Sequence, residues 1–139
     1  MITSEEALKK PLPTPDGDTA PFWAGMRDGK LLLQHCSKCN NVQYYQQQLC
    51  RRCGSEDLVY KAASGAGKVH SFSVVYRAPG PAFRDEVPYA VLLVELAEGP
   101  RMISSYKGGP AEEVAFDMNV QLVFDKISDE ITLPRFRRA

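Results

Sequence analysis

Alternating hydrophobic and polar positions dominate the second half of the chain and predict a series of β-strands. Valine, isoleucine, tyrosine and phenylalanine enrich five short runs, and glycine, proline or acidic turns separate them. The runs cover residues 65–77, 88–99, 100–108, 119–127 and 130–136. Between them, residues 110–116 offer one helical turn. Five short strands without a repeat favour a small closed barrel, with the five-stranded OB-fold as the commonest type, over a sandwich fragment with uncovered edges. The fold class is therefore mainly β.

The first half of the chain has a different pattern. Prolines alternate with other residues in residues 11–15, which predicts an extended arm. Asp18 or Thr19 can cap a short helix that has Pro21 in its first turn and Gly29 just beyond its end.

Three large apolar residues share one face of this short helix: Phe22, Trp23 and Met26. This face can pack on the core of the chain itself. It can also dock on a partner, because aromatic side chains dominate interface anchors. Both interpretations stay open at this point.

Four cysteines lie between two predicted strands, residues 30–35 and residues 58–61. Their spacing is C-x2-C-x10-C-x2-C, formed by Cys36, Cys39, Cys50 and Cys53. Two residues between cysteines let both sulfurs reach one ion, and four thiolates fill the tetrahedral shell of zinc. A filled shell is structural, because it has no open position for a water molecule. An iron occupant, a lost metal and redox-active thiols are the alternatives, although a redox C-x-x-C normally opens a helix in a βαβ unit.

The neighbours of the cysteines support the zinc ribbon. Asn40 and Gly54 follow the two pairs, where such knuckles need a left-handed backbone that these residues tolerate. Lys38, Arg51 and Arg52 can offset the negative charge of the site. So small a ribbon buries little apolar area, and we expect its fold to depend on the metal.

A long proline-rich connection, residues 77–88, links the first two strands of the barrel. Long loops in compact domains are often functional. The prolines lower the entropy lost on ordering, so we interpret this segment as a preformed binding loop.

Composition and net charge argue against nucleic-acid binding, a membrane span and secretion. Seventeen basic and seventeen acidic residues cancel, whereas nucleic-acid binders usually have a basic excess. The longest apolar stretches, such as residues 90–94, are too short to span a membrane, and the N-terminus lacks the apolar region of a secretory signal. We therefore expect a cytoplasmic protein without membrane contact, in which cysteines serve as metal ligands and not as disulfides.

The residues offer no catalytic set. His35 adjoins the first cysteine, His70 lies on a strand without a partner in sequence, and zinc would occupy every cysteine. No nucleotide-binding or nucleophile motif is present. A binding or scaffolding role follows.

Taken together, these segments resemble the zinc-ribbon plus OB-fold proteins catalogued as domain of unknown function thirty-five. The likeness runs from about Ala20 to Arg137. It is carried by FWAGMRDGKLLLQHC, CSKCNNVQYY, LCRRCGSEDL, GAGKVHSFSVVYRAPGPAF, EVPYAVLLVELAEGPRM and ITLPRF. One departure is Gln46-Gln47-Gln48, where relatives often have prolines, and we expect a less rigid loop there.

The resemblance implies a non-catalytic accessory subunit that binds and stabilises a thiolase-superfamily subunit and helps to hold its acyl-CoA substrate. The partner would be a thiolase, including the 2-benzoylsuccinyl-CoA type, an aldolase or a hydroxymethylglutaryl-CoA synthase. One structural zinc ion and a coenzyme A thioester would be the ligands. The expected organisation is an arm and short helix (1–29), a zinc ribbon (30–62) and an OB-fold domain (63–139).

Coenzyme A favours cationic groups for its phosphates and a flat apolar surface for its adenine. The candidates in and beside the long loop are Arg77, Phe83, Arg84 and Tyr89. Arg135 and Arg137 share a face of the last strand and are either further contacts or part of a solvated tail.

Two other functions compete with this interpretation. The first is an OB-fold protein that binds single-stranded nucleic acid, for which the stacking residues would be Tyr44, Tyr45, Phe72 and Tyr76. The second is a stand-alone acyl-CoA carrier or enzyme, which would need His70 or a carboxylate of raised pKa as its base.

Overall fold

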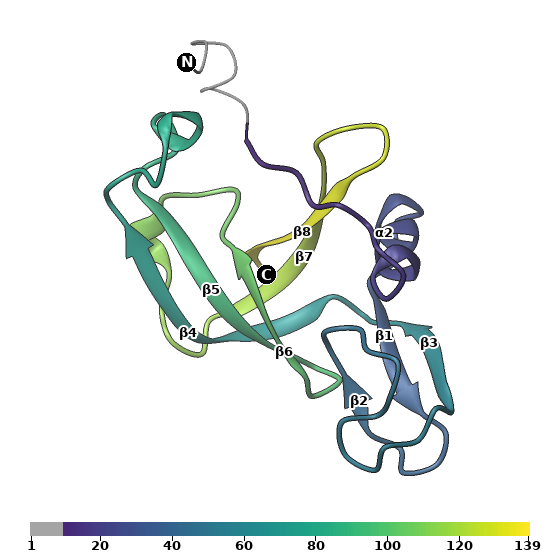
Figure 1. The fold of residues 1–139 in the computed structure, drawn as a ribbon. Helices are drawn as coiled ribbons and strands as arrows, with labels where there is room; N and C mark the ends of the chain where they lie inside the picture. Colours follow the sequence, from purple (N-terminus) through teal and green to yellow (C-terminus); the bar gives the residue numbers. More distant parts are fainter. Residues whose placement is uncertain (1–9) are drawn as a thin grey trace.

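A computed structural model describes residues 10–139 as two antiparallel sheets and one α-helix (Figure 1). Residues 1–9, which form the first part of the predicted arm (1–29), lie outside the described residues. A three-stranded sheet has the order β2-β1-β3 and a five-stranded sheet has the order β6-β5-β4-β7-β8. The smaller sheet consists of β1 (Leu32–Cys36), β2 (Val42–Gln43) and β3 (Leu58–Ala62). The larger one consists of β4 (Ala66–Val75), β5 (Tyr89–Leu96), β6 (Arg101–Ser105), β7 (Asn119–Lys126) and β8 (Thr132–Arg138).

The larger sheet curls into a nearly closed barrel. Strand β4 pairs with β7 at its beginning and with β5 along its length, and its register shifts between Val69 and Ser71. Such a bulge bends and twists a strand, which allows β4 to pair with both β5 and β7. The two edge strands approach each other where the Ser104 hydroxyl donates to the Pro134 carbonyl at 2.7 Å. The prediction of a mainly β chain with a five-stranded OB-fold barrel is confirmed.

Buried and outward-facing residues alternate along β5, and the buried ones form part of the hydrophobic core. Ala90, Leu92, Val94 and Leu96 are at most 2% exposed, and the residues between them face outward. The turn predicted between the third and fourth runs is the short 3₁₀ helix η2 (Ala111–Glu113). No helix among residues 10–139 is long and apolar enough to cross a bilayer.

Helix α2 (Ala20–Arg27) begins and ends close to its predicted limits. Thr19 is its N-cap residue, and Pro21 lies in the first turn. Gly25 allows the helix to approach β1, because a Cβ atom there would lie 2.7 Å from the Leu32 side chain. Gly29 then leaves the helix with a positive φ of 77°, which glycine adopts at little cost.

The apolar face of α2 is buried in the core of the chain. Phe22 is 0% exposed, Met26 1% and Trp23 9%, and all three belong to the same cluster as the inward residues of the barrel. The interpretation of these residues as partner anchors is therefore wrong for this structure, because buried side chains offer no surface to a partner. Their hydrophobicity serves the packing of α2 against the strands.

Candidate metal centre and ligand cavity

The four cysteines converge at the end of the small sheet. Strand β1 ends at Cys36, and tight turns bring the remaining three to it. The Cys36 and Cys53 sulfurs are 3.6 Å apart, as are those of Cys39 and Cys50, and all four lie within 4.8 Å of one another. Zinc–sulfur bonds of about 2.3 Å in a tetrahedron place the sulfurs roughly 3.8 Å apart. The donor set therefore fits one structural zinc ion.

Backbone N–H groups favour the thiolate form of two of the four cysteines, whereas on Cys39 the Asn41 N–H is outweighed by burial and the three neighbouring thiols, which raise the pKa of that thiol to about 12. The Cys39 N–H donates to Cys36 Sγ at 3.4 Å and lowers the pKa of that thiol below its ordinary value. The N–H groups of Cys53 and Arg52 act in the same way on Cys50 and lower its pKa to about 6. Zinc binds the thiolate form, so these hydrogen bonds reduce the free energy needed to remove the protons.

Two left-handed residues close the knuckles. Asn40 has a φ of 63° and Gly54 a φ of 77°, as the sequence predicted for the positions after each cysteine pair. Their N–H groups donate to the carbonyl oxygens of Cys36 and Cys50 at 2.9 Å. Each turn therefore wraps its backbone around the sulfur cluster.

The glutamine-rich loop between the knuckles is held by two buried amides, contrary to the expectation of a less rigid loop. The Gln34 amide donates to the Gln47 carbonyl at 2.8 Å and accepts from the Gln47 N–H at 3.0 Å. Gln43 donates to Gln34 at 2.8 Å and accepts from the Arg51 N–H at 2.9 Å. Side-chain amides thus replace the constraint that prolines would supply.

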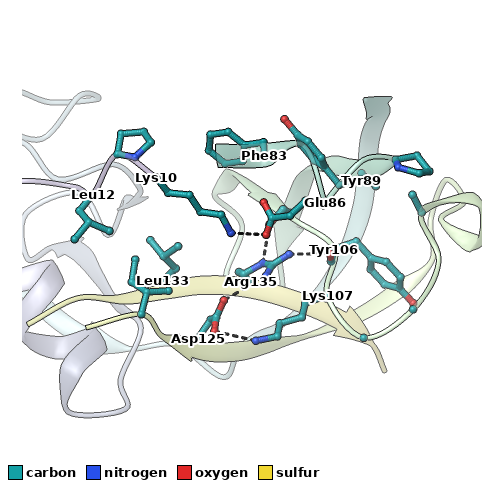
Figure 2. A pocket seen from close by; sticks show the side chains of 18 residues that line it. Lys10, Leu12, Phe83, Glu86, Tyr89, Tyr106, Lys107, Asp125, Leu133 and Arg135 are labelled. Atoms are coloured by element: carbon teal, nitrogen blue, oxygen red, sulfur yellow. Dashed lines mark hydrogen bonds and ion pairs between the residues drawn. The ribbon is translucent and has the colours of Figure 1, made fainter. Parts of the chain in front are cut away.

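A cavity of about 950 Å³ opens in the barrel on the side of the N-terminal arm (Figure 2). It is large enough for a drug-sized ligand. The arm, the long loop and strands β5 to β8 all contribute to its wall. Its apolar lining includes Leu12, Phe83, Tyr89, Ile127 and Leu133.

The polar side of the cavity is a three-residue ion cluster. The Lys107 ammonium lies 2.8 Å from one oxygen of Asp125, and the Arg135 guanidinium lies 3.2 Å from the other. Burial raises the pKa of Asp125, but the hydrogen bonds from Lys107 and Arg135 outweigh it and hold the pKa below its ordinary value. Arg135 is further fixed by the Ser105 hydroxyl at 2.9 Å and by the Tyr106 carbonyl at 3.2 Å.

A second ion pair lies where the arm meets the long loop. The Lys10 ammonium is 2.5 Å from the Glu86 carboxylate and 5.8 Å from the centre of the Phe83 ring. Phe83 in turn faces Tyr89, with ring centres 6.5 Å apart. In Figure 2, Phe83 and Tyr89 lie on the opposite side of the cavity from Asp125 and Lys107, and the Lys10–Glu86 pair is drawn between them.

The structure brings together half of the predicted coenzyme A residues. Phe83 and Tyr89 line the cavity, whereas Arg77 and Arg84 are exposed and not among its lining residues. Arg135, which the sequence left between a contact and a solvated tail, lies in the cavity wall.

Sequence reasoning missed Lys107 and Asp125. They are far apart in the chain and meet because the β6 end of the barrel closes onto β7 and β8. No local motif marks them.

The fold and the cysteine cluster define a zinc-ribbon and OB-fold protein. A family model described as the ChsH2 rubredoxin-like zinc ribbon domain matches residues 23–59, and one described as the ChsH2 C-terminal OB-fold domain matches residues 60–125. The chain belongs to this ChsH2-type, or DUF35, family.

Several curated relatives resemble the chain over most of its length. It is 35% identical over 130 residues to a probable enoyl-CoA hydratase alpha subunit from Thermomonospora curvata; the match covers 94% of this chain but only 40% of that protein. It is 32% identical to a DUF35 domain-containing scaffold protein from Methanothermobacter thermautotrophicus, with 68% of this chain and 71% of the relative covered. It is also 32% identical to the 3-oxo-4,17-pregnadiene-20-carboxyl-CoA hydratase alpha subunit of Mycobacterium tuberculosis, over 84% of this chain and 37% of that protein.

Solved structures agree with this assignment. The chain superposes on a chain of the structure described as the Ltp2-ChsH2(DUF35) aldolase with a TM-score of 0.82 and 33% identity, covering 91% of this chain and 98% of the other. A DUF35 protein of unknown function from Sulfolobus solfataricus shares the fold, with a TM-score of 0.59, 18% identity, and 86% and 83% of the two chains covered.

Proposed function

We propose that this chain is a non-catalytic accessory subunit that binds and stabilises a thiolase-like enzyme. The observation that carries the proposal is the similarity to a chain of the Ltp2-ChsH2(DUF35) aldolase, which extends over 91% of this chain at 33% identity. Relatives named as scaffold proteins support a role in assembly. We infer that catalytic groups belong to the partner.

The side chains of the described residues support this division of labour. The four cysteines converge in a cluster that zinc would fill, so none of them is left as a nucleophile once metal is bound. His35 and His70, the two histidines of the chain, do not line the cavity. We infer that the cavity wall supplies binding groups and that the nucleophile–base pair belongs to another chain.

We further propose that the cavity and the long loop help to hold an acyl-CoA thioester. Two of the relatives are named as alpha subunits of hydratases that act on CoA thioesters, and although this chain spans only 40% and 37% of their lengths, the names support this ligand class. Phe83 and Tyr89 supply flat apolar surface inside the cavity. Arg77 and Arg84 lie at exposed positions in and beside the same loop, where they can meet phosphates outside the cavity.

Co-purification tests the accessory role. The tagged chain, expressed in its native host, is expected to recover a thiolase-fold protein in equal amount, together with about one zinc ion per chain. Mass spectrometry identifies the partner, and metal analysis of the same fraction measures zinc. Recovery of the chain alone, under conditions in which zinc is retained, would contradict the proposal.

Binding measurements on the recovered complex test the acyl-CoA role. Phe83→Ala is expected to weaken acyl-CoA binding by about fivefold to tenfold, because it removes an aromatic contact from the cavity. Tyr76→Ala is the matched control: Tyr76 is 68% exposed and is not a lining residue. Equal affinities of the two variants would assign acyl-CoA entirely to the partner.

A further inference from the structure

The charged groups that line the cavity do not balance. The cations are Lys10, Lys107 and Arg135, and the acids are Glu86 and Asp125. Lys10 and Glu86 pair with each other at the rim. The surplus positive charge therefore lies in the cluster where one carboxylate, Asp125, serves both Lys107 and Arg135.

Lys107 and Arg135 have N–H groups that are not used in hydrogen bonds to the described residues. A guanidinium has five N–H donors and an ammonium has three. Arg135 uses three of them, on Ser105, Asp125 and Tyr106, and Lys107 uses one, on Asp125. Among the described residues, two N–H groups of each cation therefore have no protein acceptor. Glu113, which accepts from the Tyr106 hydroxyl, is not a lining residue.

The cluster is partly withdrawn from water, which strengthens its interaction with an anion. The Asp125 side chain is 18% exposed and that of Arg135 is 23% exposed. Charge-assisted hydrogen bonds gain strength in such surroundings. One surplus charge matches a monoanion, whereas a phosphate dianion would leave an uncompensated negative charge at the same place.

The opposite wall is apolar and flat. Phe83 and Tyr89 lie across the cavity from the cluster, and Leu12 and Leu133 lie to one side of it (Figure 2). An occupant that satisfies both surfaces has an apolar body and a negatively charged end.

We propose that the cavity binds a carboxylate carried on an apolar group, with the carboxylate at Lys107 and Arg135 and the apolar group against Phe83 and Tyr89. The preference for a carboxylate is a property of this chain. The further statement that this carboxylate is the terminal group of the acyl part of a CoA thioester rests on the proposed function.

The first test uses the 139-residue chain loaded with zinc and two probes of one shape, 4-phenylbutyrate and 4-phenylbutyramide. Isothermal titration calorimetry is expected to give at least about tenfold tighter binding of the carboxylate, the effect of one or two charge-assisted hydrogen bonds. Lys107→Gln is expected to remove most of this preference. The variant keeps the Arg135–Asp125 pair, and the Lys107 side chain is 43% exposed, so the fold should persist.

Lys126→Gln is the matched control. Lys126 lies at the end of β7, its side chain is 69% exposed, and it pairs with Asp129 at 3.7 Å outside the cavity lining. This variant should keep the wild-type preference for the carboxylate. Equal affinity of the wild-type chain for the two probes, or a preference that Lys107→Gln leaves unchanged, would overturn the inference.

A second pair of probes distinguishes the source of the carboxylate. Glutaryl-CoA and butyryl-CoA carry acyl groups with and without a terminal carboxylate. A preference for glutaryl-CoA that depends on Lys107 places the carboxylate on the thioester. If the chain prefers 4-phenylbutyrate to its amide but does not prefer glutaryl-CoA to butyryl-CoA, the cavity binds a free acid. The inference of a carboxylate site then holds, although the acyl-CoA proposal fails.

Discussion

At the scale of single residues, Asp125 determines the character of the cavity. It holds Lys107 and Arg135 in place, and Asp125 and Arg135, which are 18% and 23% exposed, would each be a costly charge without a partner. Its pKa lies below the ordinary value because the hydrogen bonds from the two cations outweigh the effect of burial. The ionised carboxylate therefore contributes to the stability of the folded chain.

The sign of the pH dependence follows from this pKa. A depressed pKa means that the contribution is complete above the unfolded value of about 3.9 and is lost as the pH falls through the lower folded value. We expect Asp125→Asn to reduce the free energy of unfolding by about 1–3 kcal/mol near neutral pH. Urea unfolding from neutral to acidic pH should show this difference shrinking below about pH 4. A difference that is constant over the whole range would contradict the assignment.

Gln34 has a comparable role in the ribbon. It is 3% exposed, and its amide bonds both polar groups of the Gln47 backbone. Gln34→Ala leaves those groups without partners, and we expect a loss of about 2–4 kcal/mol in thermal or urea unfolding. Gln48→Ala is the control, because Gln48 is exposed in the same loop, and it should lie within about 0.5 kcal/mol of the wild type.

At the scale of elements, the ribbon and the barrel are stabilised by different means. The small sheet has three strands, one of them only two residues long, and the cluster of four cysteines lies at its end. The barrel has its own alternating core in β4 to β8. The ribbon should therefore depend on metal more strongly than the barrel does.

Zinc removal tests this difference. After complete chelation, we expect residues 36–60 to become sensitive to protease, whereas β4 to β8 keep much of their hydrogen-exchange protection. Readdition of zinc should restore resistance. Unchanged cleavage of residues 36–60 in the metal-free chain would contradict the proposed dependence.

At the scale of the whole molecule, α2 joins the two sheets through one apolar cluster. The helix precedes the ribbon in sequence, yet it contacts both β1 and β8, and Phe22 and Met26 belong to the same apolar cluster as Leu33 and Phe136. A substitution that disrupts this cluster should therefore destabilise both sheets.

Phe22→Ala tests the shared core. Removal of a fully buried ring is expected to cost about 3–5 kcal/mol, measured by chemical unfolding of the zinc-loaded chain. Ile103→Ala is the control, since Ile103 is 71% exposed on β6 and its truncation should cost less than about 0.5 kcal/mol. A loss for Phe22→Ala as small as the one expected for Ile103→Ala would mean that α2 does not contribute to the common core.

Local patterns were sufficient to predict every strand except the two-residue β2, together with the helix and the cysteine cluster. Alternation identifies the inward residues of β5, and the cysteine spacing identifies the ligands, because both signals lie within a few consecutive residues. The ion cluster of Lys107, Asp125 and Arg135 needs the register of β7 with β8 and the closure of the barrel, neither of which the chain displays locally. The buried amide of Gln34 was missed for the same reason: its partners lie in a loop whose path depends on the folded knuckles.

The contact between the arm and the long loop affects how fast the cavity can exchange its contents. The described end of the arm is tied to the loop by the Lys10–Glu86 pair, whose side chains are 47% and 39% exposed. An exposed pair of this kind contributes about 0–1 kcal/mol and is weakened by salt. Separation of the arm from Glu86 therefore requires no rearrangement of the barrel, and loop or terminus motions of this type take place in nanoseconds to microseconds. Entry and release of a ligand would then be much faster than any unfolding of the chain.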